Sequence, residues 1–102
     1  MKKIPKSFTL GSFTFTVDVV SEDELEKLTD GDDCYGVFLP ERLAIYLQKP
    51  TGKLKHAVIM QTFWHEFAHA LKWVMNDKDY TNEKEVDRLG HMLKQFHDTK
   101  KN

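Results

Sequence analysis

Hydrophobic and polar residues alternate along the first half of the chain, as is typical of half-buried β-strands. Residues 7–10 and 13–17 alternate on either side of a two-residue Gly-Ser turn, which predicts a β-hairpin. Residues 35–39 and 42–47 flank a Pro-Glu pair and predict a second hairpin. The later strand of that hairpin is rich in residues that favour β structure. The first half of the chain is therefore predicted to form a sheet.

A short helix is predicted between the two hairpins. Ser21 and Glu24 have the spacing of a capping box, and Leu25 and Leu28 supply the apolar side of the helix. The acidic segment 30–33 follows. It lacks the twelve-residue spacing and the closing glutamate of an EF-hand, so we expect a solvated turn rather than a calcium site.

The second half of the chain changes to helical periodicity. A long helix is predicted from about residue 54 to 75, because its apolar residues recur at helical spacing: Val58, Ile59, Phe63, Phe67, Ala70, Leu71 and Val74. A polar turn at 76–79 separates it from a second helix. That helix has its own apolar stripe of Val86, Leu89, Leu93 and Phe96.

These elements predict an α+β fold of the small zincin-like kind. The β-hairpins form an antiparallel or mixed sheet with a short helix, and the sheet packs on the two later helices. With 102 residues and 40% hydrophobic content, the chain has material for one core. We therefore expect a single domain over residues 1–102.

Composition excludes several classes of function. A formal net charge of −1 does not predict a nucleic-acid-binding surface, which would be strongly basic. No apolar stretch has the length of a signal peptide or a membrane span, so we expect a cytoplasmic protein without a membrane partner. Cys34 is the one cysteine and cannot form an intrachain disulfide. The sequence does not predict the oligomeric state.

The segment His65-Glu66-Phe67-Ala68-His69 lies inside the long predicted helix. Residues four apart share one face of a helix, with Cβ atoms about 5–6 Å apart. His65 and His69 can therefore bind one Zn²⁺ at about 2.0–2.1 Å. Glu66 is rotated by about 100° from His65 around the helix axis. This makes Glu66 a poor ligand but a candidate general base for a zinc-bound water.

Acidic residues at the start of the second predicted helix offer a third ligand. Glu83 and Asp87 are four apart and share a face. Glu85 faces away from them and has capping-box spacing from Asn82, which accounts for Glu85 without a metal. We therefore favour Glu83 over Glu85 as the ligand. His91 continues the same face by another turn and is a further candidate.

The His-Glu-x-x-His helix followed by a helix that opens with paired acids resembles the gluzincin zinc metallopeptidases. The resemblance implies that Glu83 completes the zinc site with His65 and His69. It also implies that Asp87 orients a ligating histidine. The order of elements is similar to that of small phage and mobile-element proteins and of the repressor-cleaving ImmA/IrrE-type peptidases. Those peptidases favour Ala-Asn after the glutamate, where this chain has Val-Asp.

The resemblance implies zinc-dependent hydrolysis of a peptide bond, with a protein or peptide as substrate. In the family, a strand that precedes the active helix forms the rim on which the substrate lies extended. The matching segment is 43–48, where a peptide would add to an exposed sheet edge. The candidate substrate-binding residues are Leu43, Ala44, Ile45 and Tyr46.

Several alternatives remain open from the sequence. The family adds a tyrosine or histidine that stabilises the oxyanion, and Tyr46, Tyr80 and His91 are the candidates. A zinc-binding interaction module without turnover, such as an adaptor or anti-repressor, would need the same ligands but not Glu66. Cys34 could serve as an inhibitory zinc ligand, although a small buried residue is its simpler role.

Overall fold

The computed structural model describes residues 4–29, 31, 34–52 and 54–101. The acidic turn predicted at 30–33 thus lies largely outside the described residues. The elements follow in the order β1 (Ser7–Leu10), β2 (Phe13–Val20), α1 (Glu22–Leu28), β3 (Gly36–Leu39), the 3₁₀ turn η1 (Pro40–Arg42), β4 (Ala44–Gln48), α2 (His56–Val74) and α3 (Glu83–Thr99). The predicted α+β class is confirmed.

The four strands form one mixed sheet in the order β1-β2-β4-β3. Both predicted hairpins are confirmed, since β1 pairs antiparallel with β2 and β3 pairs antiparallel with β4. The turn between β1 and β2 contains Gly11 at φ 60°, a conformation that glycine adopts without strain. A parallel pairing of β2 with β4 joins the two hairpins. This pairing places β4 in the interior of the sheet and leaves β3 at its edge.

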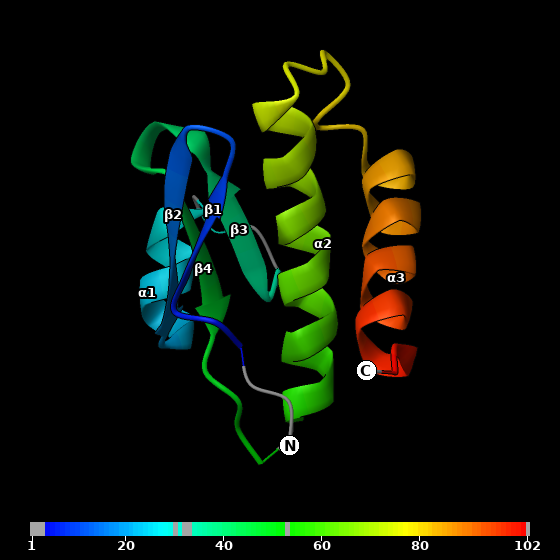
Figure 1. The fold of residues 1–102 in the computed structure, drawn as a ribbon. Helices are drawn as coiled ribbons and strands as arrows, with labels where there is room; N and C mark the ends of the chain where they lie inside the picture. The colour runs from blue at the N-terminus through cyan, green and yellow to red at the C-terminus, as the bar shows by residue number, and fades with distance from the viewer. Residues whose placement is uncertain (1–3, 30, 32–33, 53, 102) are drawn as a thin grey trace.

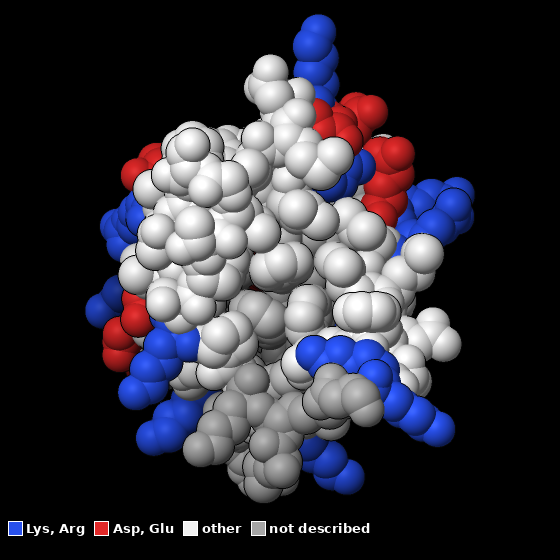
Figure 2. Space-filling view, in the orientation of Figure 1, with Lys and Arg blue, Asp and Glu red and all other residues white. Residues whose placement is uncertain are grey.

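The helices lie on both faces of the sheet (Figure 1). Helix α1 covers one face and begins where the Ser21 hydroxyl accepts a hydrogen bond from the backbone N–H of Glu24 at 3.2 Å. Helix α2 packs on the other face, and α3 packs against the side of α2 away from the sheet. Among the described residues, no helix combines the length and apolar character needed to cross a bilayer. On the face shown in Figure 2, charged side chains gather mainly around the rim.

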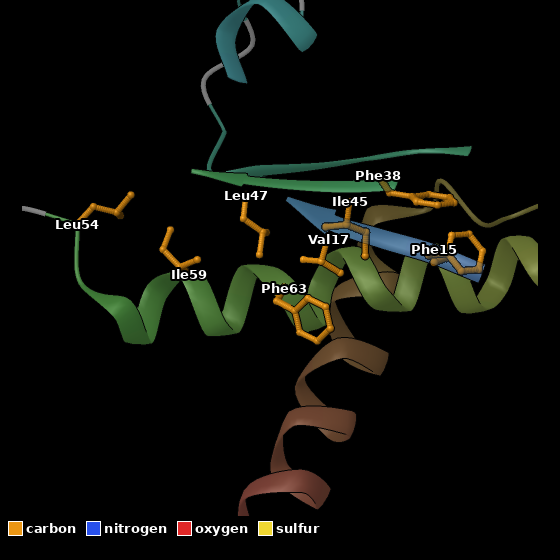
Figure 3. Packing of buried hydrophobic residues seen from close by; sticks show 9 residues of the cluster. Phe15, Val17, Phe38, Ile45, Leu47, Leu54, Ile59 and Phe63 are labelled. Atoms are coloured by element: carbon orange, nitrogen blue, oxygen red, sulfur yellow. The ribbon is translucent and has the colours of Figure 1, made fainter. Parts of the chain in front are cut away.

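The hydrophobic core lies between the sheet and α2. In Figure 3, Val17 and Leu47 of the strands point toward α2, and Ile59 of α2 points back toward the sheet. Phe15, Ile45, Leu47 and Ile59 are completely buried there. Because α2 is anchored along its length by these contacts, its opposite face is held in a defined orientation toward α3.

Two apolar positions of the predicted helical stripes are exposed. Val58, in the first turn of α2, is 38% exposed, and Phe96, near the end of α3, is 68% exposed. On α3, Val86 is fully buried and Leu89 and Leu93 are half-buried. The contact between α2 and α3 therefore uses mainly the first part of the predicted stripe.

Gly90 is a buried residue of α3 that faces α2. A Cβ atom built on Gly90 would lie 3.1 Å from both the Cα of His65 and the carbonyl oxygen of Trp64. The backbones of the two helices approach this closely because residue 90 has no side chain. Gly90 thus fixes the spacing of α3 from the turn of α2 that carries His65.

Candidate metal centre

Three side chains predicted as zinc ligands converge between α2 and α3. The Nε2 atom of His65 lies 2.8 Å from Oε2 of Glu83, and the Nε2 atom of His69 lies 3.2 Å from Oε1 of Glu83. One ligand atom from each residue lies within 4.8 Å of the other two. The three residues form a His-His-Glu group that could hold a metal ion.

His69 is held in one orientation by the connection between the helices. Its Nδ1 atom lies 2.6 Å from the backbone carbonyl oxygen of Tyr80. Because a carbonyl oxygen only accepts, Nδ1 of His69 must carry the proton. Its Nε2 atom faces the carboxylate of Glu83. With Nδ1 directed at the Tyr80 carbonyl, Nε2 is the nitrogen that a metal would take, in exchange for any proton on it.

His65 lies between two carboxylates. Its Nε2 atom contacts Glu83, and its Nδ1 atom lies 3.6 Å from Oδ1 of Asp87. The same oxygen of Asp87 lies 3.6 Å from Nε2 of His91. His91 is not a member of the converging group, and its Nε2 atom lies 3.5 Å from Nε2 of Gln61. Asp87 is thus placed between the two imidazoles of His65 and His91.

Glu66 is 8% exposed and follows His65 directly on α2. Burial raises the pKa of its carboxyl group to about 7. Among the nearby charges, His65 lowers this pKa and Glu83 raises it, while a hydrogen bond from the backbone of Phe38 lowers it. A carboxyl group with a pKa near neutrality can both accept and release a proton near pH 7.

Glu85, the alternative third ligand, is engaged elsewhere. Its Oε2 atom accepts a hydrogen bond from Nζ of Lys72 at 3.0 Å. Its backbone N–H donates to Oδ1 of Asn82 at 3.1 Å, so Asn82 caps the N-terminus of α3. Among the described residues, the group that could hold a metal ion therefore contains Glu83 and not Glu85.

A cleft of about 820 Å³ opens beside this group. Besides His65, Glu66, His69 and Glu83, its lining includes residues of β3 and the segment before it, of the first turns of α2, of the α2–α3 connection and of α3: Cys34, Tyr35, Phe38, Thr62, Tyr80 and His91. Two of the three candidate oxyanion residues therefore line the cleft.

Tyr46, the third candidate, does not line the cleft. Its hydroxyl accepts a hydrogen bond from Nη1 of Arg42 at 3.4 Å instead. Tyr35 was not singled out from the sequence, although it lines the cleft and is 45% exposed. Its position just before the edge strand β3 is what brings it there, and that position depends on the sheet order.

The segment expected to bind substrate, 43–48, has no free edge. Strand β4 pairs with β2 on one side and with β3 on the other. Ala44 and Ile45 are buried, and Leu43 lies before the strand at φ 50°. None of Leu43, Ala44, Ile45 and Tyr46 lines the cleft. The prediction of an exposed edge at 43–48 was wrong because the sheet continues beyond β4.

The free edge that borders the cleft belongs to β3. The backbone N–H of Gln48 donates to the carbonyl of Tyr35, and Val37 is paired with Tyr46. Because hydrogen-bonded and non-hydrogen-bonded pairs alternate in an antiparallel ladder, the N–H and C=O groups of Gly36 and Phe38 point away from β4. The N–H of Phe38 on this side donates to the carboxyl group of Glu66. The N–H and C=O groups of Gly36 and the C=O group of Phe38 are therefore the ones directed toward the edge.

The donor set fits zinc. Two imidazoles and one carboxylate form a known ligand set of catalytic zinc sites, which keep a fourth position open. Ligand atoms bound at about 2.0–2.1 Å in a tetrahedral arrangement lie about 3.3 Å apart. Nε2 of His65 lies 2.8 Å from Oε2 of Glu83 and Nε2 of His69 lies 3.2 Å from Oε1, so each nitrogen has a carboxylate oxygen at about this separation.

Comparisons with protein-family models, with curated proteins and with solved structures find no match for this chain. The gluzincin resemblance is therefore supported by the converging group of His65, His69 and Glu83 alone. What can be stated of function from the structure is that two helices bring together a possible metal-binding group beside a cleft.

Proposed function

We propose that this chain is a zinc-dependent metalloendopeptidase of the gluzincin type. The observation that supports this most directly is the group of His65, His69 and Glu83 next to the nearly buried carboxyl group of Glu66. Structural zinc sites are closed by four protein ligands, whereas catalytic sites use three. The group found among the described residues has three members and borders a cleft with room for a substrate.

Each residue of the site has a role in the proposed reaction. When bound, zinc would polarise the substrate carbonyl and lower the pKa of a coordinated water to about 7. Glu66 accepts a proton from the attacking water and delivers it to the leaving amine, and its nearly buried carboxyl group beside His65 is placed for both transfers. The Tyr80 carbonyl holds His69 in the ligand tautomer, and Asp87 orients His65.

The substrate peptide is proposed to pair with the free edge of β3. The N–H and C=O groups of Gly36 and the C=O group of Phe38 point toward this edge, beside the Phe38 N–H that donates to Glu66, and both residues line the cleft. An extended peptide added there by main-chain hydrogen bonds would lie beside Glu66. When zinc-loaded Glu66→Gln protein is titrated with a peptide substrate, the changes in backbone amide NMR chemical shift should be largest at residues 36–38. If the largest changes occurred at residues 43–46, this placement of the substrate would be contradicted.

The experiment that tests the function combines metal analysis with a peptidase assay. Wild-type protein is reconstituted with zinc and compared with His69→Ala, Glu83→Ala and Glu22→Ala. Glu22→Ala is the matched control, because Glu22 begins α1 and neither lines the cleft nor belongs to the converging group. We expect about one zinc per chain in the wild type and the control, and loss of zinc in the other two variants.

Hydrolysis of an unstructured protein substrate then separates an enzyme from a binding module. Glu66→Gln should retain zinc and lose turnover, because the amide cannot accept the proton. Zinc binding without turnover in the wild type would support the interaction module in place of the peptidase. A wild-type chain that binds no zinc after reconstitution would refute both.

A further inference from the structure

Lys72 is a nearly buried lysine of α2 that has no part in the proposed chemistry. The residue is 8% exposed, although lysine is rarely buried without a partner. It lies three residues after His69, close to the same face of α2. Its Nζ atom lies 3.0 Å from Oε2 of Glu85 and 3.5 Å from Oδ2 of Asp77. Lys72 thus joins α2 both to the α2–α3 connection and to α3.

Asp77, one of the two partners of Lys72, makes several hydrogen bonds within the α2–α3 connection. Its backbone N–H donates to the carbonyl of Lys72 at 3.0 Å, and its carboxylate accepts from the backbone N–H of Asp79 at 2.8 Å. Its carbonyl accepts from the N–H of Tyr80 at 3.2 Å. Asn76, at φ 58°, turns the chain out of α2 immediately before. The position of Tyr80 is therefore fixed through Asp77.

The position of Tyr80 decides the orientation of His69. The Tyr80 carbonyl accepts the Nδ1–H of His69 at 2.6 Å, so a shift of the connection would lengthen or break this hydrogen bond. Without it, either imidazole nitrogen could carry the proton. An imidazole protonated on Nε2 could not present that atom to a metal.

The carboxylate of Glu85, the second partner of Lys72, connects Lys72 to α3. Glu85 lies in the first turn of α3, two residues after Glu83, so its ion pair with Lys72 holds the turn that carries the third ligand. The hydrogen bond to Glu85 raises the pKa of Lys72, so the ammonium stays charged. In Figure 2, acidic and basic side chains lie together at the upper end of the molecule, where Figure 1 places the connection.

We propose that Lys72 is a positioning residue that keeps the Tyr80 carbonyl directed at His69. Its two ion pairs tie α2 to the connection and to the first turn of α3, and so hold the histidine and Glu83 in register. The benefit of this positioning, a better zinc site, rests on the proposed function. The positioning itself is a property of the metal-free protein and can be measured in it.

The test compares Lys72→Met with Lys94→Met in the full chain. Methionine keeps an unbranched apolar stem and removes the ammonium. Lys94 is the matched control, because its ion pair with Asp98 at 2.6 Å lies within α3. Side-chain ¹⁵N shifts of His69 in the metal-free protein report which nitrogen carries the proton. Amide exchange of Tyr80 reports the connection, and competition with a chelator gives the zinc affinity.

In the wild type and Lys94→Met, we expect a proton on Nδ1 of His69, directed at the Tyr80 carbonyl, and slow exchange at Tyr80. In Lys72→Met, we expect partial loss of the proton from Nδ1, faster exchange at Tyr80 and a zinc affinity about 10–100-fold weaker. Lys72→Arg should restore the proton on Nδ1, because a guanidinium can also donate to two carboxylates.

Unchanged protonation of Nδ1 of His69 together with unchanged Tyr80 exchange in Lys72→Met would overturn the proposal, whatever the zinc affinity. A loss of the proton from Nδ1 in a protein that binds no zinc would support the positioning role and refute the zinc function. If Lys72→Met does not fold, Asp77→Asn removes the ion pair of Lys72 with the connection. Asparagine keeps the oxygen that accepts from Asp79, so Nδ1 must again lose its proton in part for the proposal to stand.

Discussion

Gly90→Ala is the substitution that tests most directly how the helix spacing controls the metal centre. The added Cβ would lie 3.1 Å from the Cα of His65 and the carbonyl oxygen of Trp64, and 3.2 Å from the backbone nitrogen of His65. These neighbours are backbone atoms, so no flexible side chain can yield. Helix α3 must instead move away from α2 by a few tenths of an ångström, and it carries Glu83 with it.

The magnitude follows from two opposing effects. Overpacking a close contact costs about 1–3 kcal/mol, whereas replacing glycine with alanine inside a helix stabilises by about 1 kcal/mol. We expect a net loss of about 0–2 kcal/mol in the free energy of unfolding. Because the contact is at His65 itself, we expect zinc affinity to fall by about tenfold or more.

Urea denaturation of the metal-free protein measures the first quantity, and competition with a chelator measures the second. Gly52→Ala is the matched control, since a Cβ there meets nothing within 4 Å. A Gly90→Ala protein that is about 1 kcal/mol more stable than the wild type and binds zinc equally well would refute the reasoning. The higher helix propensity of alanine would then account for the whole change in stability.

Three further outcomes are expected. Burial raises the pKa of Glu66 from 4.5 to about 7. Between these two pH values the folded metal-free protein keeps a proton on Glu66 that the unfolded chain releases. The free energy of unfolding should therefore fall by about 3 kcal/mol as the pH rises from 4.5 to about 7. Urea midpoints at about pH 5 and about pH 8 should show this fall in the wild type and not in Glu66→Gln. Asn76→Ala should lower the free energy of unfolding by about 1 kcal/mol in thermal melts, because φ is 58° at this position. Tyr46→Phe should leave peptide hydrolysis unchanged, since its hydroxyl bonds Arg42 outside the cleft; a large loss of kcat would contradict the placement of the site.

Local patterns predicted the elements because each depends on residues close in sequence. The capping spacing of Ser21 and Glu24 and the periodicity of the two long helices needed no knowledge of the sheet. The parallel pairing of β2 with β4 could not be predicted, because it joins 16–20 to 44–48 across α1 and β3. The alternation within a strand does not encode its partner, which is why 43–48 was expected at an edge.

The same distinction applies to the site. The spacing of His65 and His69 is local, so the sequence alone placed both on one helix face. Gly90 and Lys72 act through contacts between elements, and the only signal for Gly90 was a glycine inside a helical pattern. Tyr35 lines the cleft because β3 is the edge strand, so it could be identified only once the sheet order was known.

The proposed ligands come from one continuous stretch, residues 65–83, at the two sides of a short helical hairpin. Loop-closure entropy grows with loop length, so the hairpin can form before the longer loop between β2 and β4 is closed. A metal bound to the hairpin would therefore already be held in the folding transition state. For this protein, zinc should accelerate folding as well as slow unfolding, so that the refolding limb of the chevron shifts with metal concentration.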